Sequence, residues 1–158
     1  MLEIVNEAAK AYDGNIPSDR YHQPYMPLKE LEQEIDDGVS FYGVDSDGRL
    51  VAIMGIQDRG AFELIRHAYT RPSMQGQGFG SLLLAHLLAL AKKRILVGTW
   101  KGAVWAIRFY EKHGFSQVSE REKDRLLVEY WSIPTRQVET SVVLAHESTS
   151  GGAPISRS

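Results

Sequence analysis

Three closely spaced glycines, Gly76, Gly78 and Gly80, separate a segment typical of a β-strand from a strongly apolar segment with helical periodicity. The strand is expected over Ala61–Thr70, and the helix is expected to begin at Gly76 and to end near Arg94. When a strand, a glycine-rich loop and a helix follow in this order, the first N–H groups of the helix lack partners and the helix dipole adds partial positive charge there. Such a unit can bind a pyrophosphate, although a glycine cluster by itself can also make only a tight turn.

The segments on either side of this unit alternate between helical and strand patterns, which indicates one α+β domain. A β-hairpin is expected around the turn at 45–48, and a capping box at Ser119 and Glu122 begins a later helix. The other expected elements are helices at 3–12, 27–37 and 104–113 and strands at 39–44, 50–56, 95–98 and 137–144. We expect the domain to cover residues 1–145 and residues 146–158 to form a flexible tail, because the latter offer little to bury.

Strand alternation predicts which side chains of the segment 61–70 share a face of the sheet. Successive side chains of a strand point to opposite faces. One face is therefore expected to carry Leu64, Arg66 and Ala68, and the other Glu63, Ile65, His67 and Tyr69.

Composition argues against several classes of protein. The net charge of −2 gives no excess positive field for nucleic acid, and the longest apolar run, 82–91, is much shorter than the ~20 residues of a membrane span. The N-terminus lacks the basic and apolar regions of a secretory signal, so we expect a cytoplasmic protein without nucleic-acid or membrane partners. There is no cysteine to carry an acyl group, and the five histidines lack the spacing of zinc ligands, so no metal is expected.

Spacing disfavours two common nucleotide-binding motifs at the glycine loop. A P-loop would need lysine followed by serine or threonine after its last glycine, but Ser81 and Leu82 follow Gly80. The dinucleotide fingerprint would need a glycine where Ser81 stands. Neither ATP nor NAD fits the loop.

Two motifs resemble those of the GNAT family of N-acetyltransferases. The sequence Gln75-x-x-Gly78-x-Gly80, with Thr70-x-Pro72 before it, is similar to the family's pyrophosphate-binding motif. The sequence 106–115, Ala-Ile-Arg-Phe-Tyr-Glu-Lys-His-Gly-Phe, looks like its second motif, Ala-x-x-Phe-Tyr-Glu-Lys-x-Gly-Phe. The resemblance covers about 39–144 and implies an α+β fold whose mixed central sheet is splayed between two parallel strands, with helices on both faces.

The resemblance also implies acetyl-coenzyme A as co-substrate and the residues that bind it. The edge of the strand at Ala68, Tyr69 and Thr70 would pair with pantetheine. The pyrophosphate would lie on the N–H groups of the loop residues Gln75, Gly76, Gln77, Gly78, Phe79, Gly80 and Ser81. One position departs from the pattern, since Ala103 stands where the family often has an asparagine that binds pantetheine.

Three residues are candidates for catalysis. By the resemblance, Tyr110 would lie near the coenzyme sulfur and support the departing thiolate. His67, in the middle of a strand, could take a proton from the acceptor amine or could be an ordinary core histidine. Glu63 is a second candidate base, or a surface carboxylate without a role. Arg66 fits a buried cation paired with an acid and has no place in the mechanism.

The acceptor is expected to be a primary amine of a small molecule or peptide that attacks the thioester directly in a ternary complex. Its pocket would be walled by the polar and aromatic side chains of Tyr21, His22, Tyr25, Trp100 and Trp105. Core packing is an alternative role for at least one of the tryptophans. The chain could pair as a homodimer. Because of Ala103, a non-catalytic acyl-coenzyme A sensor or regulatory module remains the alternative function.

Overall fold

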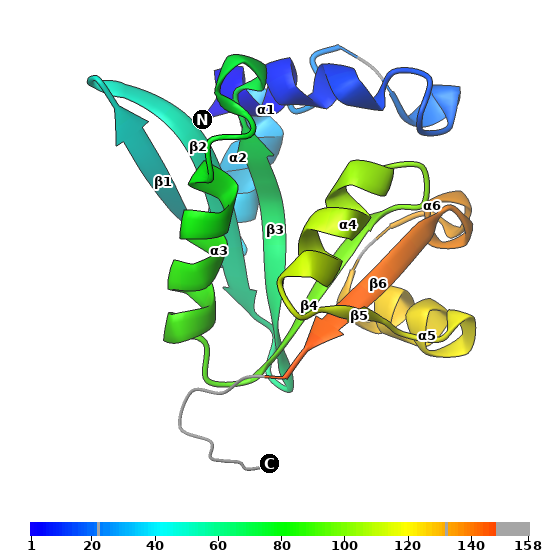
Figure 1. Ribbon diagram of the computed structural model, residues 1–158. Helices are drawn as coiled ribbons and strands as arrows, with labels where there is room; N and C mark the ends of the chain where they lie inside the picture. The colour runs from blue at the N-terminus through cyan, green and yellow to red at the C-terminus, as the bar shows by residue number, and fades with distance from the viewer. Residues whose placement is uncertain (22, 132, 148–158) are drawn as a thin grey trace.

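The computed structural model describes residues 1–21, 23–131 and 133–147, and six of its strands form one mixed sheet (Figure 1). The order across the sheet is β1-β2-β3-β4-β6-β5. Only β3 and β4 run parallel among these neighbours, and the other adjacent strands are antiparallel. The strands are β1 Ser40–Ser46, β2 Arg49–Asp58, β3 Phe62–Thr70, β4 Arg94–Trp100, β5 Ser116–Gln117 and β6 Ser141–His146.

Helices cover both faces of the sheet, as expected. The helices are α1 Leu2–Ala8, α2 Leu28–Asp36, α3 Phe79–Leu90, α4 Val104–Lys112, α5 Glu120–Tyr130 and α6 Thr135–Glu139. On one face, α3 and α4 share a core with Ile65. On the other face, α5 and α6 pack with Leu64 and Leu96, while α1 and α2 pack with Ile53 (Figure 1). Within the described residues, no helix is long and apolar enough to cross a membrane.

The parallel strands β3 and β4 separate halfway along their length. Their last paired residues are Ile65 and Val97, and beyond this point the two strands diverge. This divergence is the splay that the sequence predicted. It opens the middle of the sheet between the last residues of β3 and those of β4.

A β-bulge in β3 overturns the predicted alternation of its side chains. Gly55 of β2 pairs with Arg66, but Ile53 pairs with Tyr69, so β3 has one residue more than β2 between these pairs. His67 sits in this bulge with φ of 56°. The extra residue reverses the alternation. Leu64 therefore lies in the core beneath α5 and Ala68 packs in the core beneath α3, rather than both on one face.

Other boundaries differ from the sequence prediction where local patterns were ambiguous. The expected last strand at 137–144 is wrong in its first half, because residues up to Glu139 form α6 and the strand begins at Ser141. The expected helix at 76–94 is shorter, since α3 ends at Leu90 and Arg94 already belongs to β4. The capping box is confirmed: the N–H of Glu122 donates to Ser119 Oγ at 3.2 Å. Residues 148–158 of the predicted tail lie outside the described residues.

Candidate active site

A cavity of about 180 Å³ lies where β3 and β4 diverge. Its lining comes from the splayed halves of both strands, from α4, from the N-terminal segment and from the chain around α5, α6 and β6. Six of the predicted site residues line it: His67, Ala68, Tyr69, Tyr110, Tyr25 and Trp100. The splay thus brings together candidates from the predicted catalytic, coenzyme-binding and acceptor-binding sets.

Tyr110 reaches this cavity from the last turns of α4. Its ring is held by Phe115, with ring centroids 5.3 Å apart, and the residue is only 4% exposed. Burial, together with the nearby Tyr12 phenol, raises the pKa of Tyr110 far above its usual value, so the phenol stays protonated. Among the described residues, no group hydrogen-bonds the Tyr110 hydroxyl. It is therefore a free donor at the cavity.

His67 lies in the bulge of β3 and contacts a carboxylate from α2. Its Nε2 is 3.2 Å from Oε2 of Glu34, without the alignment of a hydrogen bond, and the two side chains are 16% and 18% exposed. His67 Nε2 is fully buried. Nδ1 is not fully buried, and it makes no hydrogen bond within the described part of the chain. Nδ1 is therefore the ring nitrogen that is not enclosed by the protein, in a residue that lines the cavity.

Glu34 is ionised in this setting despite its burial. Burial by itself would raise the pKa of the Glu34 carboxyl, but the contact with His67 and the charge of Arg66 outweigh this effect and lower the pKa below 4.5. No local pattern singles out Glu34, because it looks like any polar residue on an amphipathic helix. Only the packing of α2 on β3 brings it beside His67.

Arg66 is paired with an acid, as the sequence indicated, but it is only partly buried. Its Nη1 donates to Oε1 of Gln57 at 3.0 Å, and its Nη2 donates to Oε1 of Glu34 at 3.3 Å. Gln57 is itself buried and donates from Nε2 to the Asp37 carbonyl at 2.9 Å. This network fastens α2 to the sheet beside the cavity.

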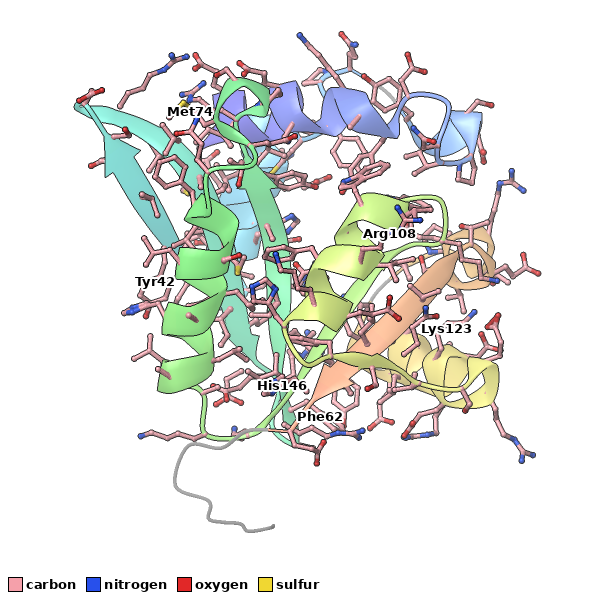
Figure 2. All side chains as sticks on the ribbon, viewed as in Figure 1. Tyr42, Phe62, Met74, Arg108, Lys123 and His146 are labelled. Atoms are coloured by element: carbon pink, nitrogen blue, oxygen red, sulfur yellow. The ribbon has the colours of Figure 1, made fainter. Side chains whose placement is uncertain are left out.

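Glu63 does not reach the cavity. Its Oε2 accepts hydrogen bonds from the N–H groups of Lys92 and Lys93 at 2.9 and 3.0 Å, so it holds the connection between α3 and β4. It pairs in register with Ile95, at the end where β3 and β4 are still joined. Figure 2 labels Phe62 near this end of the sheet. The structure therefore removes the support for Glu63 as the base.

The glycine loop leaves a row of N–H groups without acceptors at the start of α3. In the described part of the chain, none of the N–H groups from Gly76 to Ser81 donates to another residue, and the first helical bond runs from Leu82 N–H to the Gly78 carbonyl at 3.0 Å. Gly76 and Gly78 have φ of 81° and 86°, in the left-handed region that favours glycine. This geometry fits the predicted anion site.

The loop is anchored at its base by Arg71, which the sequence analysis missed. Its N–H donates to the Val51 carbonyl at 2.8 Å, its Nε donates to the Leu50 carbonyl at 2.7 Å, and its guanidinium forms an ion pair with Glu3 of α1. In Figure 2, Met74 of the loop is labelled beside α1. The buried arginine therefore fixes the loop between the β-hairpin and α1.

Aromatic side chains form one wall of the cavity. Tyr12, at the end of the first expected helix, lies 5.2 Å from the Tyr25 ring and 5.9 Å from the Trp105 ring, measured between centroids. The Trp100 indole donates to the Tyr25 hydroxyl at 3.2 Å. Tyr21 and Trp105 stack on this group but do not line the cavity. His22 lies outside the described residues.

The α+β acyltransferases have a mixed sheet that opens between two parallel strands. A helix whose first N–H groups are free begins beside this opening. The sequence agrees with this class. The profile of the acetyltransferase (GNAT) family matches residues 2–115, so the chain belongs to this family.

Solved structures of other acetyltransferases share the fold. A GNAT-family acetyltransferase from Staphylococcus aureus Mu50 is 17% identical, with 94% of this chain and 90% of that chain covered and a TM-score of 0.68. The PaiA N-acetyltransferase from Thermoplasma acidophilum, in complex with coenzyme A, is 13% identical (92% and 89%; TM-score 0.64). A GNAT-family acetyltransferase from Elizabethkingia anophelis with acetyl-CoA bound is 18% identical (77% and 83%; TM-score 0.59). None of the curated proteins compared with the chain matches its sequence.

Proposed function

We propose that the protein transfers the acetyl group of acetyl-coenzyme A to a primary amine within a ternary complex. The observation that carries this proposal is the cavity at the splay, which both Tyr110 and His67 line. Two of the similar structures hold coenzyme A or acetyl-CoA, which supports the choice of co-substrate.

The coenzyme would be bound by backbone groups. The unpaired N–H groups from Gly76 to Ser81 would hold its pyrophosphate, since they combine free donors with the positive end of the α3 dipole. Past Ile65, the β4-facing edge of β3 has no partner strand, so Ala68, Tyr69 and Thr70 are free to bind pantetheine along that edge. The thioester would then lie in the splay.

The chemistry would be a direct transfer. The amine nitrogen attacks the thioester carbon, the C–S bond breaks, and the acetyl group ends on the amine. No cysteine is present for an acyl-enzyme. We assign to His67 Nδ1 the proton released by the amine, with Glu34 stabilising the imidazolium that forms. Tyr110 would give a hydrogen bond or its proton to the departing thiolate.

One observation favours a second candidate function, that of an acyl-coenzyme A sensor. Ala103, fully buried at the start of α4, has no side-chain amide for pantetheine. An assay of coenzyme A release with a panel of amines, beside calorimetry with acetyl-CoA, separates the two functions. Turnover with any amine supports the enzyme, whereas tight binding of acetyl-CoA without turnover supports the sensor. The cytoplasmic location and the homodimer stay predictions.

A further inference from the structure

The charge of the cavity lining restricts what the acceptor can carry. None of the described residues that line the cavity is an aspartate or glutamate, and the undescribed residues 22, 132 and 148–158 contain neither type. Glu34 contacts the lining residues Arg66 and His67, but its charge is already balanced by Arg66, so a second ammonium on the acceptor would find no unpaired carboxylate there. An unpaired buried charge is strongly disfavoured.

The one permanent cation among these lining residues is already in use. The two Nη groups of Arg66 are bound to Gln57 and Glu34. An acceptor carboxylate that paired with Arg66 would have to share the guanidinium with Glu34, and the two like charges would then lie close together. The lining is therefore unfavourable for a carboxylate as well as for a second ammonium.

Rings supply most of the cavity's bulky surface. Tyr12, Tyr25, Tyr69, Trp100 and Trp131 all line it. The Tyr12 ring packs edge-on to Tyr69, with centroids 6.5 Å apart, which connects the N-terminal segment to the bulged end of β3. Ring faces attract both other rings and an ammonium group. These walls suit an aromatic body.

The volume agrees with an acceptor of modest size. The cavity measures about 180 Å³. For comparison, an apolar cavity of about 150 Å³ can hold benzene. Because the thioester would share this space, the buried part of the acceptor is at most about one ring in size.

We propose that the acceptor is a monoamine with an uncharged aromatic body, of the arylalkylamine type, rather than a polyamine, an aminoglycoside or a free amino acid. This inference rests on the proposed function, because it assigns the cavity to the acceptor of that reaction. It goes further in naming the chemical class that the lining selects.

Matched pairs of amines test the inference. 2-Phenylethylamine against n-butylamine measures the effect of the ring. n-Butylamine against 1,4-diaminobutane measures the effect of a second ammonium group. 2-Phenylethylamine against phenylalanine measures the effect of a carboxylate. We expect kcat/KM about tenfold higher with the ring, and about tenfold or more lower with either added charge. Equal values for the first pair, or a gain from either added charge, would overturn the inference.

Calorimetry with the same amines on protein saturated with coenzyme A separates this inference from the proposed function. If no amine is turned over but the binding order is as expected, the transferase proposal fails and the assignment of the cavity stands. If amines are turned over but the order is reversed, the transferase proposal stands and the inference fails. If 2-phenylethylamine does not bind to the protein, the inference also fails.

A variant links the preference to the walls of the cavity. Tyr12→Leu removes one ring and should lower kcat/KM about tenfold for 2-phenylethylamine and much less for n-butylamine. Tyr42→Leu is the matched control, because its ring contacts His86 of α3 and does not line the cavity. Trp131→Leu serves the same purpose if Tyr12→Leu does not fold. An unchanged ratio between the two amines in a folded variant would contradict the assignment.

Discussion

Nε2 of His67, in the bulge of β3, lies 3.2 Å from Oε2 of Glu34 on α2. The contact joins a residue of the central sheet to a helix that covers it, at the rim of the cavity. It holds one ring nitrogen of His67 in the interior, whereas Nδ1 is not fully buried. An acid that orients an imidazole and stabilises its protonated form is a recurrent arrangement in catalysis.

Replacing Glu34 by glutamine should slow the reaction. Glu34→Gln keeps the size of the side chain but removes the charge that stabilises the protonated imidazole, so we expect kcat to fall about tenfold with little change in the KM for acetyl-CoA. Glu32→Gln, on the exposed side of the same helix, is the control and should leave kcat unchanged. Equal rates for Glu34→Gln and the native protein would show that the contact is only structural.

The Glu34 contacts should also make stability depend on pH. The pKa of Glu34 is lowered in the folded protein, so its contribution to stability is present above the ordinary value of 4.5 and is lost as the pH falls through the lower, folded-state pKa. The melting temperature of the native protein should therefore drop below pH 4.5 more steeply than that of Glu34→Gln. Parallel melting curves across this pH range would contradict the assignment.

His67→Gln tests the base directly. Glutamine cannot accept the proton, so the acidic limb of the pH–rate profile should flatten while the affinity for acetyl-CoA stays the same. The profile is measured from initial rates of coenzyme A release, and affinity by calorimetry. An acidic limb identical to that of the native protein would return His67 to a packing role in the bulge.

Tyr110→Phe removes only the hydroxyl group. Because no described residue hydrogen-bonds that hydroxyl, the melting temperature should change little. If the phenol supports the leaving thiolate, kcat should fall by roughly 10²–10⁴ with little change in acetyl-CoA affinity. Wild-type turnover, with chemistry shown to limit the rate, would exclude Tyr110 as the acid.

Gly78→Leu tests the anion site on the loop. A side chain built on Gly78 would project into open space beside the free N–H groups, at φ of 86°. Gly60→Leu, in the turn before β3, is a matched control with φ of 82° and equally open surroundings. Both variants should lose about 1–2 kcal/mol of stability, but only Gly78→Leu should weaken acetyl-CoA binding, by about tenfold or more. Equal affinities in the two variants would argue against pyrophosphate binding at this loop.

Gly80 is less suited to this test. Its Cβ would lie 3.5 Å from ring carbons of Phe109, on the side where α3 approaches α4. A larger residue there would disturb the packing of the two helices, and a loss of binding would have two explanations.

The features that the sequence determined are those whose signals are local. The glycine loop, the start of the following helix and the motif around Tyr110 are encoded within short stretches, because free N–H groups, left-handed turns and helix caps depend on neighbours in the chain. The predicted order of strands and helices follows from periodicity for the same reason. The exception among the strands, the segment 137–144, shows that periodicity alone does not separate a short helix from a strand.

Only the tertiary structure decided which residues meet at the cavity. The bulge at His67 arises from pairing between β2 and β3, and a bulge is not visible in the pattern of β3 alone. Glu34 reaches His67, and Tyr12 reaches the cavity, through the packing of distant N-terminal segments on the sheet. Glu63 lies away from the cavity because β3 carries it to the joined end of the parallel pair, whereas the cavity lies where the pair separates. Strand register and helix packing depend on contacts between segments that are distant in the chain. They therefore cannot be read from the local pattern of any one segment.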